Sequence, residues 1–398
     1  MSIAPRAMVS SIHSSALQPL PLYDLAVIGG GPAGTAAAWE AARRGRRVLM
    51  IERGSLPRDR VCGEFVSAEA LPLIERMLAA ARPGLFAAAP LISGLRLAGR
   101  DFCLPRPGRG IPRRELDAAL WEAALAAGAE GRLRTEAFRL EPAGDGFRMA
   151  LRMAAGKAMV AARGIVAAPG RWWRLEGLRS GQENVHALAA APWVGVKAHL
   201  DHIQADAVEL YFFSGGYCGL APVGQGRVNA CCLVHRDALH RPQAGLGESD
   251  DFPAWLMAAA QDAALSARLR SARQTTPTVF TAPVWLGHGR PRSGRVALAG
   301  DAAGFLDPFT GDGIARALLG GRAAAIALLD PDARPRPAGS ERRAFYAARA
   351  LRRTLGLPAP FLAALLRLPG APALVRLAFH GTRSRAAAPR NDDPCPCQ

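Results

Sequence analysis

The feature that most constrains the fold is a glycine-rich turn near the start of the chain. Residues 25–28, LAVI, predict a buried strand, followed by GGGPAG and an alanine-rich helix expected to end at Arg44. Gly29, Gly31 and Gly34 form a GxGxxG pattern. The first glycine permits a tight turn, the second lets a pyrophosphate approach the backbone, and the third lets the helix pack closely on the strand. The pattern predicts a dinucleotide-binding βαβ unit.

The next segment completes this pattern. RRVLMIE predicts a second strand ending on Glu52, eighteen residues after Gly34. An acid at that position accepts hydrogen bonds from both hydroxyls of a ribose. Free N–H groups and the positive helix end, around Pro32 and Ala33, would hold the phosphates.

A second glycine-rich turn lies near residue 300. GRVALAGD predicts a buried strand ending in Gly300 and Asp301, and Pro308, Gly311 and Gly313 precede the next helix. An acid there can accept a ribityl hydroxyl, and a proline turn can lie flat against an isoalloxazine ring. Glycine N–H groups and a positive helix end stabilise an anionic reduced flavin. A simple NAD dehydrogenase needs none of this, so the turn favours FAD.

The middle and end of the chain have different patterns. WVGVKAHL, AVELYFF and GRVNACCLV predict strands without intervening helices, which is typical of an antiparallel sheet. After about residue 335, three basic amphipathic segments predict helices. We expect them to cap the core, with a membrane surface as the alternative.

DLAVIGGGPAG, IPRRELDAAL and GDAAGFLDPFTGDGI together resemble the flavoprotein superfamily with the p-hydroxybenzoate hydroxylase fold. VCGEFVSAEAL is similar to the geranylgeranyl reductase-like branch, and the resemblance covers about residues 22–330. It implies an α/β fold: a Rossmann-like FAD-binding domain, an inserted antiparallel β-sheet substrate domain and a helical C-terminal region. By the resemblance, Arg113 and Asp301 contact FAD, and we place Arg53 and Arg60 in the same site. Arg113 could instead be a solvated arginine that opens a helix.

The expected domain boundaries follow from these patterns. They are an N-terminal arm at 1–21, an FAD-binding domain at 22–95, 108–185 and 286–334, a substrate domain at 96–107 and 186–285, and a helical region with a loose tail at 335–398.

Cys62 lies in the polar stretch RDRVCGEFVS. In the branch that the chain resembles, this segment passes beside the flavin, which implies that Cys62 lies near the ring. Cys62 is either a weak acid in the reaction, with Arg60 as the basic group that favours its thiolate, or a packing group.

The predicted substrate wall departs from that branch, which usually shows a YxWxFP segment. Here the segment begins at Tyr217, and Gly219 and Ala221 replace the two aromatic residues. The wall should be wider or differently shaped, which brings a long isoprenoid substrate into question. Tyr217 is expected to pack, with proton donation as the alternative.

A second departure lies in RGIVAAPGRWWRLEGL, where hydroxylases of the superfamily carry an Asp-Gly motif. Pro169, Gly170 and Arg171 replace it, which weakens the case for an NADPH-dependent hydroxylase. Trp172 and Trp173 are expected to pack.

Charge and cysteine content exclude other classes. The net charge is +17, but the basic residues are almost all arginine and follow no nucleic-acid-binding motif, so we expect no nucleic-acid partner. The seven cysteines show no metal-site spacing, and HLDH at residues 199–202 lacks a third ligand, so we expect no metal. Cys395 and Cys397 are assigned to the loose tail. The chain lacks a signal-peptide pattern and a long apolar run, which predicts a cytoplasmic protein, with peripheral membrane contact as an alternative.

The sequence therefore predicts an FAD-dependent oxidoreductase acting on a hydrophobic small molecule. The favoured reaction is reduction of a C=C bond, with Cys62, Tyr217 or water as the proton donor. The alternatives are a monooxygenase acting on an aromatic or polyketide substrate and a membrane-surface flavin electron carrier. NADPH, NADH and an electron-donor protein stay open as sources of electrons.

Overall fold

The computed structural model describes residues 20–171, 175–177, 191–239, 251–288, 292–330, 338–357 and 359–383. Residues 1–19 of the predicted arm, Trp172, Trp173, and the tail with Cys395 and Cys397 lie outside these ranges.

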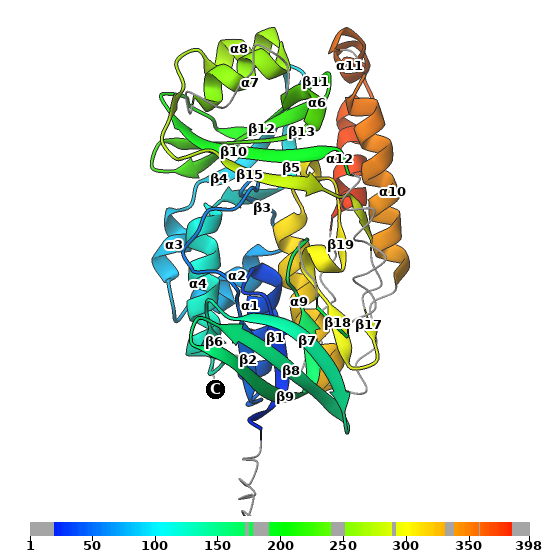
Figure 1. Cartoon of the computed structure of the whole chain (residues 1–398). Helices are drawn as coiled ribbons and strands as arrows, with labels where there is room; N and C mark the ends of the chain where they lie inside the picture. The colour runs from blue at the N-terminus through cyan, green and yellow to red at the C-terminus, as the bar shows by residue number, and fades with distance from the viewer. Residues whose placement is uncertain are drawn as a thin grey trace, which may run out of the picture.

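The first sheet carries the nucleotide-binding unit (Figure 1). Its strands are β1 Leu22–Ile28, β2 Val48–Ile51, β6 Glu130–Arg132, β7 Glu136–Ala143, β8 Gly146–Met153, β9 Gly156–Ala167, β17 Arg292–Ser293 and β18 Val296–Leu298. β18, β9, β1, β2 and β6 lie side by side in that order, and every pairing among them is parallel. β17 and the β7–β8 hairpin extend the sheet with antiparallel pairs. The predicted βαβ unit at the front of the chain is confirmed.

Three helices pack around the glycine turns: α1 Pro32–Ala42, α4 Arg113–Ala126 and α9 Gly313–Leu329. α1 and α9 pack so closely that only glycine fits at position 321, because a Cβ there would lie 1.9 Å from the Ala33 carbonyl oxygen. The strand expected to end in Gly300 and Asp301 ends earlier, with β18. Gly300–Ala302 forms a short 3-10 turn, η2, because Gly300 adopts a φ of +61° that ends the extended backbone.

The second sheet forms the other half of the protein, above the first sheet in Figure 1. Its strands are β3 Phe65–Val66, β4 Leu91–Leu97, β5 Arg100–Gly110, β10 Trp193–Asp201, β11 Ala207–Phe213, β12 Gly216–Gly224, β13 Arg227–His235, β14 Arg273–Gln274 and β15 Val279–Val284. The order is β14-β10-β13-β12-β11-β4-β5-β3. β15 also pairs with β10, at different residues of that strand from β14. All pairs in this sheet are antiparallel except β11 with β4. The three strands predicted from WVGVKAHL, AVELYFF and GRVNACCLV are confirmed as β10, β11 and β13.

The early part of this sheet is longer than the segment expected at 96–107. β4 begins at Leu91, which pairs with Arg109 near the end of β5. β5 runs on to Gly110 although it contains Pro105 and Pro107, residues that are depleted in strands.

The remaining elements are short or lie at the periphery. They are β16 Gly287–His288, β19 Gly304–Phe305, the 3-10 turn η3 Pro308–Thr310, α2 Leu71–Leu78, α3 Pro83–Ala88, α6 Arg236–Leu239, α7 Phe252–Ala260, α8 Ala263–Leu269, α10 Ala338–Leu355, α11 Ala359–Leu366 and α12 Ala371–Thr382.

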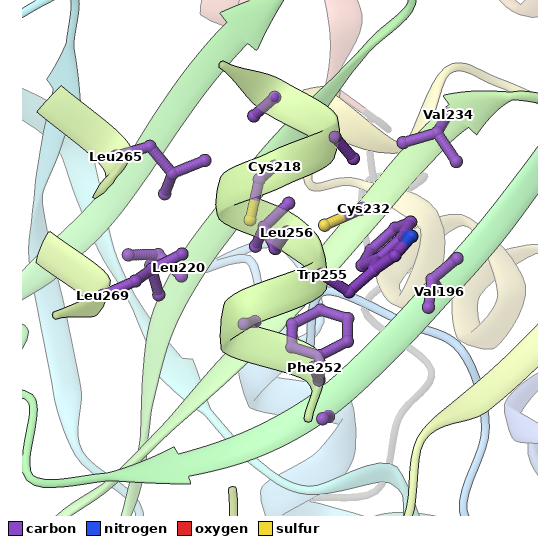
Figure 2. Packing of buried hydrophobic residues seen from close by; sticks show 14 of the residues in the cluster. Val196, Cys218, Leu220, Cys232, Val234, Phe252, Trp255, Leu256, Leu265 and Leu269 are labelled. Carbon is purple, nitrogen blue, oxygen red and sulfur yellow. The ribbon is translucent and has the colours of Figure 1, made fainter. Parts of the chain in front are cut away.

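Helices α7 and α8 cover the outer face of the second sheet (Figure 1). Figure 2 shows Phe252, Trp255 and Leu256 of α7 packed against side chains of the sheet, among them Cys218 and Cys232. Both cysteines are almost fully buried, so they are part of this core. Since successive strand residues point to opposite faces, the other face of the sheet is turned toward the FAD-binding half.

The C-terminal helices lie along one side of both halves, with α10 and α12 roughly side by side and α11 at one end (Figure 1). Leu355, Leu362 and Leu366 pack with Leu97 and Leu210 of the second sheet in one apolar cluster. The expectation that these helices cap the core is therefore confirmed. None of the described helices is long and apolar enough to cross a membrane.

Candidate active site

A cavity of about 600 Å³ lies between the two halves of the protein. Fourteen of the sixteen predicted site residues line it: Gly31, Pro32, Ala33, Glu52, Arg53, Arg60, Cys62, Arg113, Tyr217, Gly300, Asp301, Pro308, Gly311 and Gly313. The two remaining predicted residues, Gly29 and Gly34, lie behind this surface. The structure thus brings the two distant glycine turns and the Cys62 segment to one site.

The three fingerprint glycines differ in the space around them. A Cβ on Gly34 would lie 1.8 Å from the Gly29 carbonyl oxygen, and one on Gly29 would lie 2.1 Å from the Ala168 oxygen. Both positions are closed by backbone. A Cβ on Gly31 would meet no atom within 4 Å, and Gly31 lines the cavity before the N-terminus of α1. The open space and the helix end fit the pyrophosphate of FAD.

Glu52 directly follows β2, which ends at Ile51, one residue before the predicted end, and it is 4% exposed. Its carboxylate accepts hydrogen bonds from the N–H groups of Gly30 (2.9 Å) and Gly54 (2.8 Å) and from Arg58 (2.6 Å). Burial alone would raise the pKa of Glu52, but the two N–H donors and the arginines outweigh it and lower that pKa. The side chain is therefore an anionic acceptor at the cavity wall, suited to ribose hydroxyls.

We expect Glu52→Gln to weaken FAD binding by roughly tenfold to a hundredfold. Hydrogen bonds to a charged group contribute about 1.5–3 kcal/mol, and about 1.4 kcal/mol corresponds to a factor of ten in affinity. FAD titration of the apoprotein measures the effect, with Glu136→Gln on the far β7 strand as a control for loss of one charge. Wild-type affinity in Glu52→Gln would place Glu52 away from the ribose.

The second glycine turn faces the same cavity. Pro308 opens η3, and Gly311 ends it with a φ of +66°, directly before α9. A Cβ on Gly311 would lie 3.0 Å from the Phe65 ring, so this turn lies against the segment that carries Cys62. These groups fit the flavin end of FAD: a proline turn, free glycine N–H groups and the N-terminus of a 17-residue helix.

Cys62 lines the cavity between the two glycine turns. Its Sγ accepts a hydrogen bond from the N–H of Glu64 at 3.4 Å, and its carbonyl accepts one from Asn229 Nδ2 at 3.0 Å. The side chain also touches the apolar cluster under α2 and α4. The thiol is thus held in place and open to the cavity.

Besides Arg60, the basic group expected beside Cys62, Arg113 also lines the cavity with Cys62. Arg60 turns toward Glu52, with an N–O distance of 3.8 Å. Arg113 opens α4 and is anchored by Asp117 at 2.7 and 2.8 Å. Burial opposes its charge, but Asp117 outweighs burial and raises the pKa of Arg113, and Cys62 adds to that effect. A buried guanidinium anchored in this way can stabilise an anion at Cys62.

Sequence reasoning missed a buried charged cluster behind Cys62. The Glu64 carboxylate accepts hydrogen bonds from Lys197 Nζ (2.5 Å) and the N–H of Arg113 (2.7 Å), and it pairs with His199 Nε2 (2.6 Å). All three side chains are almost fully buried. One signal could have revealed the cluster: Lys197 stands inside the apolar strand WVGVKAHL, where a charge requires a partner.

Tyr217 lines the cavity, but its hydroxyl donates its hydrogen bond to another protein group. Its hydroxyl donates to Asp307 Oδ1 at 3.0 Å, and Arg352 of α10 forms an ion pair with the other Asp307 oxygen. Burial, followed by the nearby Asp307, raises the pKa of Tyr217 well above its usual value. The ring packs against Phe212 and Phe309, with centroids 5.2 and 6.0 Å away. This arrangement favours packing over proton donation.

The part of the cavity beyond Tyr217 is apolar. Gly219 and Ala221 follow Tyr217 on the same face of β12 and also line the cavity. Their small side chains leave room there. The surrounding wall consists of apolar side chains from three regions of the fold: Leu95, Leu97, Leu104, Val208, Leu210, Leu351, Leu355, Val375 and Phe379.

Among the described residues, no group of three or more His, Cys, Asp or Glu is placed to hold a metal ion. His199 of the HLDH segment is engaged by Glu64, and His202 is exposed.

Comparison with known proteins agrees with this geometry. A family model described as an FAD binding domain matches residues 23–328. Digeranylgeranylglycerophospholipid reductase 2 of Methanopyrus kandleri is 32% identical over 315 residues, which cover 76% of this chain and 76% of that protein. Menaquinone reductase of Mycolicibacterium smegmatis is 29% identical over 329 residues, which cover 76% of this chain and 75% of that protein. The predicted resemblance to reductases of this type is confirmed.

A solved structure gives the same result for the fold. A geranylgeranyl bacteriochlorophyll reductase-like protein from Thermoplasma acidophilum superimposes with a TM-score of 0.65 at 20% identity, covering 93% of this chain and 94% of that chain. Flavin-dependent halogenases share the fold as well. The fold alone therefore does not determine the reaction.

Proposed function

Because the chain belongs to this FAD-binding family and is an FAD-dependent oxidoreductase, we propose that it reduces a carbon–carbon double bond in a long apolar lipid of the isoprenoid type. The observation that carries this proposal is the cavity, which joins three features. Its lining includes the dinucleotide turn at Gly31, Cys62, and a leucine-rich wall together with Tyr217.

The composition of that wall supports an apolar substrate. Replacing two aromatic residues by Gly219 and Ala221 changes the width of the cavity but leaves its lining apolar. The names of the two relatives point in the same direction, since one reduces menaquinone and the other digeranylgeranylglycerophospholipid. An apolar chain entering this space would displace water from leucine and valine side chains, which favours binding.

The residues around the cavity supply the other requirements of the reaction. When bound at the two glycine turns and reduced, FAD would supply the hydride chemistry for the double bond. Cys62 donates the proton to one carbon of that bond, so that two hydrogens add across the bond and no oxygen is consumed. The Glu64 N–H and the Arg113 guanidinium stabilise the thiolate that remains. The Tyr217 hydroxyl keeps its proton and donates a hydrogen bond to Asp307, and the ring shapes the wall.

Product analysis tests this reaction. FAD-loaded enzyme, reduced with dithionite under nitrogen, is incubated with a geranylgeranyl-bearing lipid or with a menaquinone, and the products are analysed by mass spectrometry. The proposal predicts a gain of two hydrogens for each double bond reduced. A gain of oxygen in air, with no product under nitrogen, would contradict it and favour the monooxygenase. Repeating the assay with NADPH or NADH in place of dithionite tests each as the electron donor.

We also propose that the protein rests on an anionic membrane surface through the outer face of α11 and α12. Phe361 of α11 (68%), Leu374 and Leu377 of α12 (59% and 69%), and Leu368 in the turn between the two helices (55%) are exposed. Exposed arginines accompany these side chains, and the whole chain has a net charge of +17. The inward residues of α12, among them Val375 and Phe379, line the cavity. A lipid could therefore pass from the bilayer into the cavity beside this helix.

The double variant Phe361→Glu/Leu377→Glu should reduce binding to anionic liposomes by about tenfold or more, because burying each large apolar side chain contributes about 1.5–3 kcal/mol. Co-sedimentation measures the bound fraction. Met159→Glu on β9, which is 37% exposed, is the control for an added charge at an apolar surface position. If the double variant binds liposomes as well as Met159→Glu does, the membrane contact lies elsewhere.

A further inference from the structure

The backbone directly after Cys62 has an unusual conformation. Glu64 has a φ of +57°, in the left-handed region that side chains other than glycine rarely adopt, and it is fully buried. Such a conformation persists only where the surroundings hold it. The adjacent Gly63 could adopt this conformation without strain, but the chain places the carboxylate-bearing residue there instead.

The surroundings hold Glu64 by its side chain. Lys197 and His199, both on β10, contact different oxygens of the carboxylate, and the first N–H of α4 contacts it as well. Burial alone would raise the pKa of Glu64, but His199 and Lys197 outweigh it and lower that pKa. The carboxylate is therefore ionised, and its ligands come from two separate elements.

The backbone of Glu64 holds the Cys62 turn in its place. The Glu64 N–H donates to Cys62 Sγ, and the Glu64 carbonyl accepts a hydrogen bond from the N–H of Ile111 at 2.9 Å. Asn229 on β13 holds the Cys62 carbonyl. The position of the thiol thus depends on a turn whose central residue is fixed by a buried ionic cluster.

We infer that Glu64 is a positioning residue: its carboxylate, clamped by Lys197 and His199, holds the left-handed turn that presents the Cys62 thiol to the cavity. The inference rests on the proposed function only for the effect on turnover. Its geometric part, the place of the thiol, can be tested without any substrate.

Three variants separate the clamp from other roles of Glu64. Glu64→Gly accepts the left-handed backbone without strain and removes the clamp, but it leaves the buried Lys197 without its partner. Glu64→Gln keeps an acceptor for Lys197 and for the N–H of Arg113 but loses the charge. Glu64→Met/Lys197→Met removes the clamp and leaves no unpaired buried charge, so it tests the same point if a single variant fails to fold.

A matched control exists in the same sheet. Glu209 is also fully buried and accepts hydrogen bonds from Arg268 (2.7 Å) and Tyr211 (2.6 Å). It lies between Val208 and Leu210, which line the cavity, so its side chain points to the opposite face of the sheet. Glu209→Gln therefore disturbs a buried ionic cluster without touching the Cys62 turn.

The experiment measures alkylation of Cys62 by iodoacetamide in FAD-loaded protein, quantified by peptide mass spectrometry, with the exposed Cys103 as an internal reference. The ratio of the Cys62 alkylation rate to the Cys103 alkylation rate should change by about tenfold or more in Glu64→Gly, because thiol reactivity follows the groups around the sulfur. The change should be smaller in Glu64→Gln. The ratio should stay near the wild-type value in Glu209→Gln. A wild-type ratio in Glu64→Gly and in the double methionine variant would overturn the inference.

A second readout connects the clamp to the reaction. Glu64→Gly should lower turnover of an isoprenoid lipid while flavin reduction by dithionite keeps its wild-type rate. An altered alkylation ratio, in an enzyme whose wild type reduces no such lipid, would support the clamp and contradict the proposed function. Normal turnover in Glu64→Gly, with a wild-type enzyme that is active, would contradict the clamp.

Discussion

Replacing Cys62 with serine is expected to lower turnover by about a hundredfold or more, the usual scale for losing a positioned general acid, while FAD stays bound. The two side chains are nearly isosteric, so the cavity should keep its shape. A serine hydroxyl is a far weaker acid than a thiol, and its oxygen gains less from the Arg113 guanidinium. The reduction of FAD by its donor needs no proton from Cys62 and should be spared.

Stopped-flow traces of the two half-reactions measure this effect, with Cys103→Ser as a control at an exposed cysteine. A second substitution distinguishes chemistry from packing. If Cys62 only fills space, Cys62→Ala should keep its oxidative half-reaction, and Cys62→Ser should show lower stability instead. Wild-type oxidative turnover in Cys62→Ala would remove Cys62 from the mechanism and leave Tyr217 or water as the donor.

Gly31→Val is expected to abolish detectable FAD binding while the apoprotein keeps its stability. Its Cβ would enter open space at the cavity wall, where the pyrophosphate should bind, and its backbone has an ordinary φ of −82°. Losing two charge-assisted hydrogen bonds of about 1.5–3 kcal/mol each corresponds to roughly a hundredfold to ten-thousandfold in affinity.

Gly34→Val gives the contrasting result. Its Cβ would lie 1.8 Å from the Gly29 carbonyl oxygen, so the apoprotein itself should be destabilised. FAD titration and thermal unfolding of both apoproteins separate the two effects. If Gly31→Val binds FAD normally, the phosphates do not approach the N-terminus of α1.

The features that the sequence predicted well are local ones. The βαβ unit at Gly29–Glu52 and the turn from Gly300 to Gly313 are encoded in short stretches, because glycine spacing and a single apolar run determine their geometry. These stretches were enough to predict FAD and most of the cavity wall. The strands β10, β11 and β13 were also predictable, since each is one continuous apolar or alternating run.

The features that the sequence did not reveal depend on contacts between distant residues. Glu64 meets Lys197 and His199 across sequence separations of 133 and 135 residues. Asp307 meets Arg352, 45 residues away, only because α10 folds back along the second sheet. Nothing in the sequence around these residues encodes the partner.

The direction of the Arg60 side chain is another feature that the sequence did not reveal. Arg60 stands two residues before Cys62, but its side chain turns toward Glu52, while the Arg113 side chain at the start of α4 is paired with Asp117. Proximity in sequence was a poor guide because consecutive side chains in this irregular segment point in different directions.

The most direct test of the account is a single turnover without oxygen. Enzyme with fully reduced FAD is mixed under nitrogen with a geranylgeranyl-bearing lipid, and the visible absorbance of oxidised flavin is followed while the lipid is analysed in parallel. The account predicts that the flavin reoxidises in step with the appearance of one saturated bond per FAD, and that Cys62→Ala slows this step by about a hundredfold. A flavin that stays reduced with every lipid offered, and reoxidises only when air is admitted, would contradict the proposed reduction.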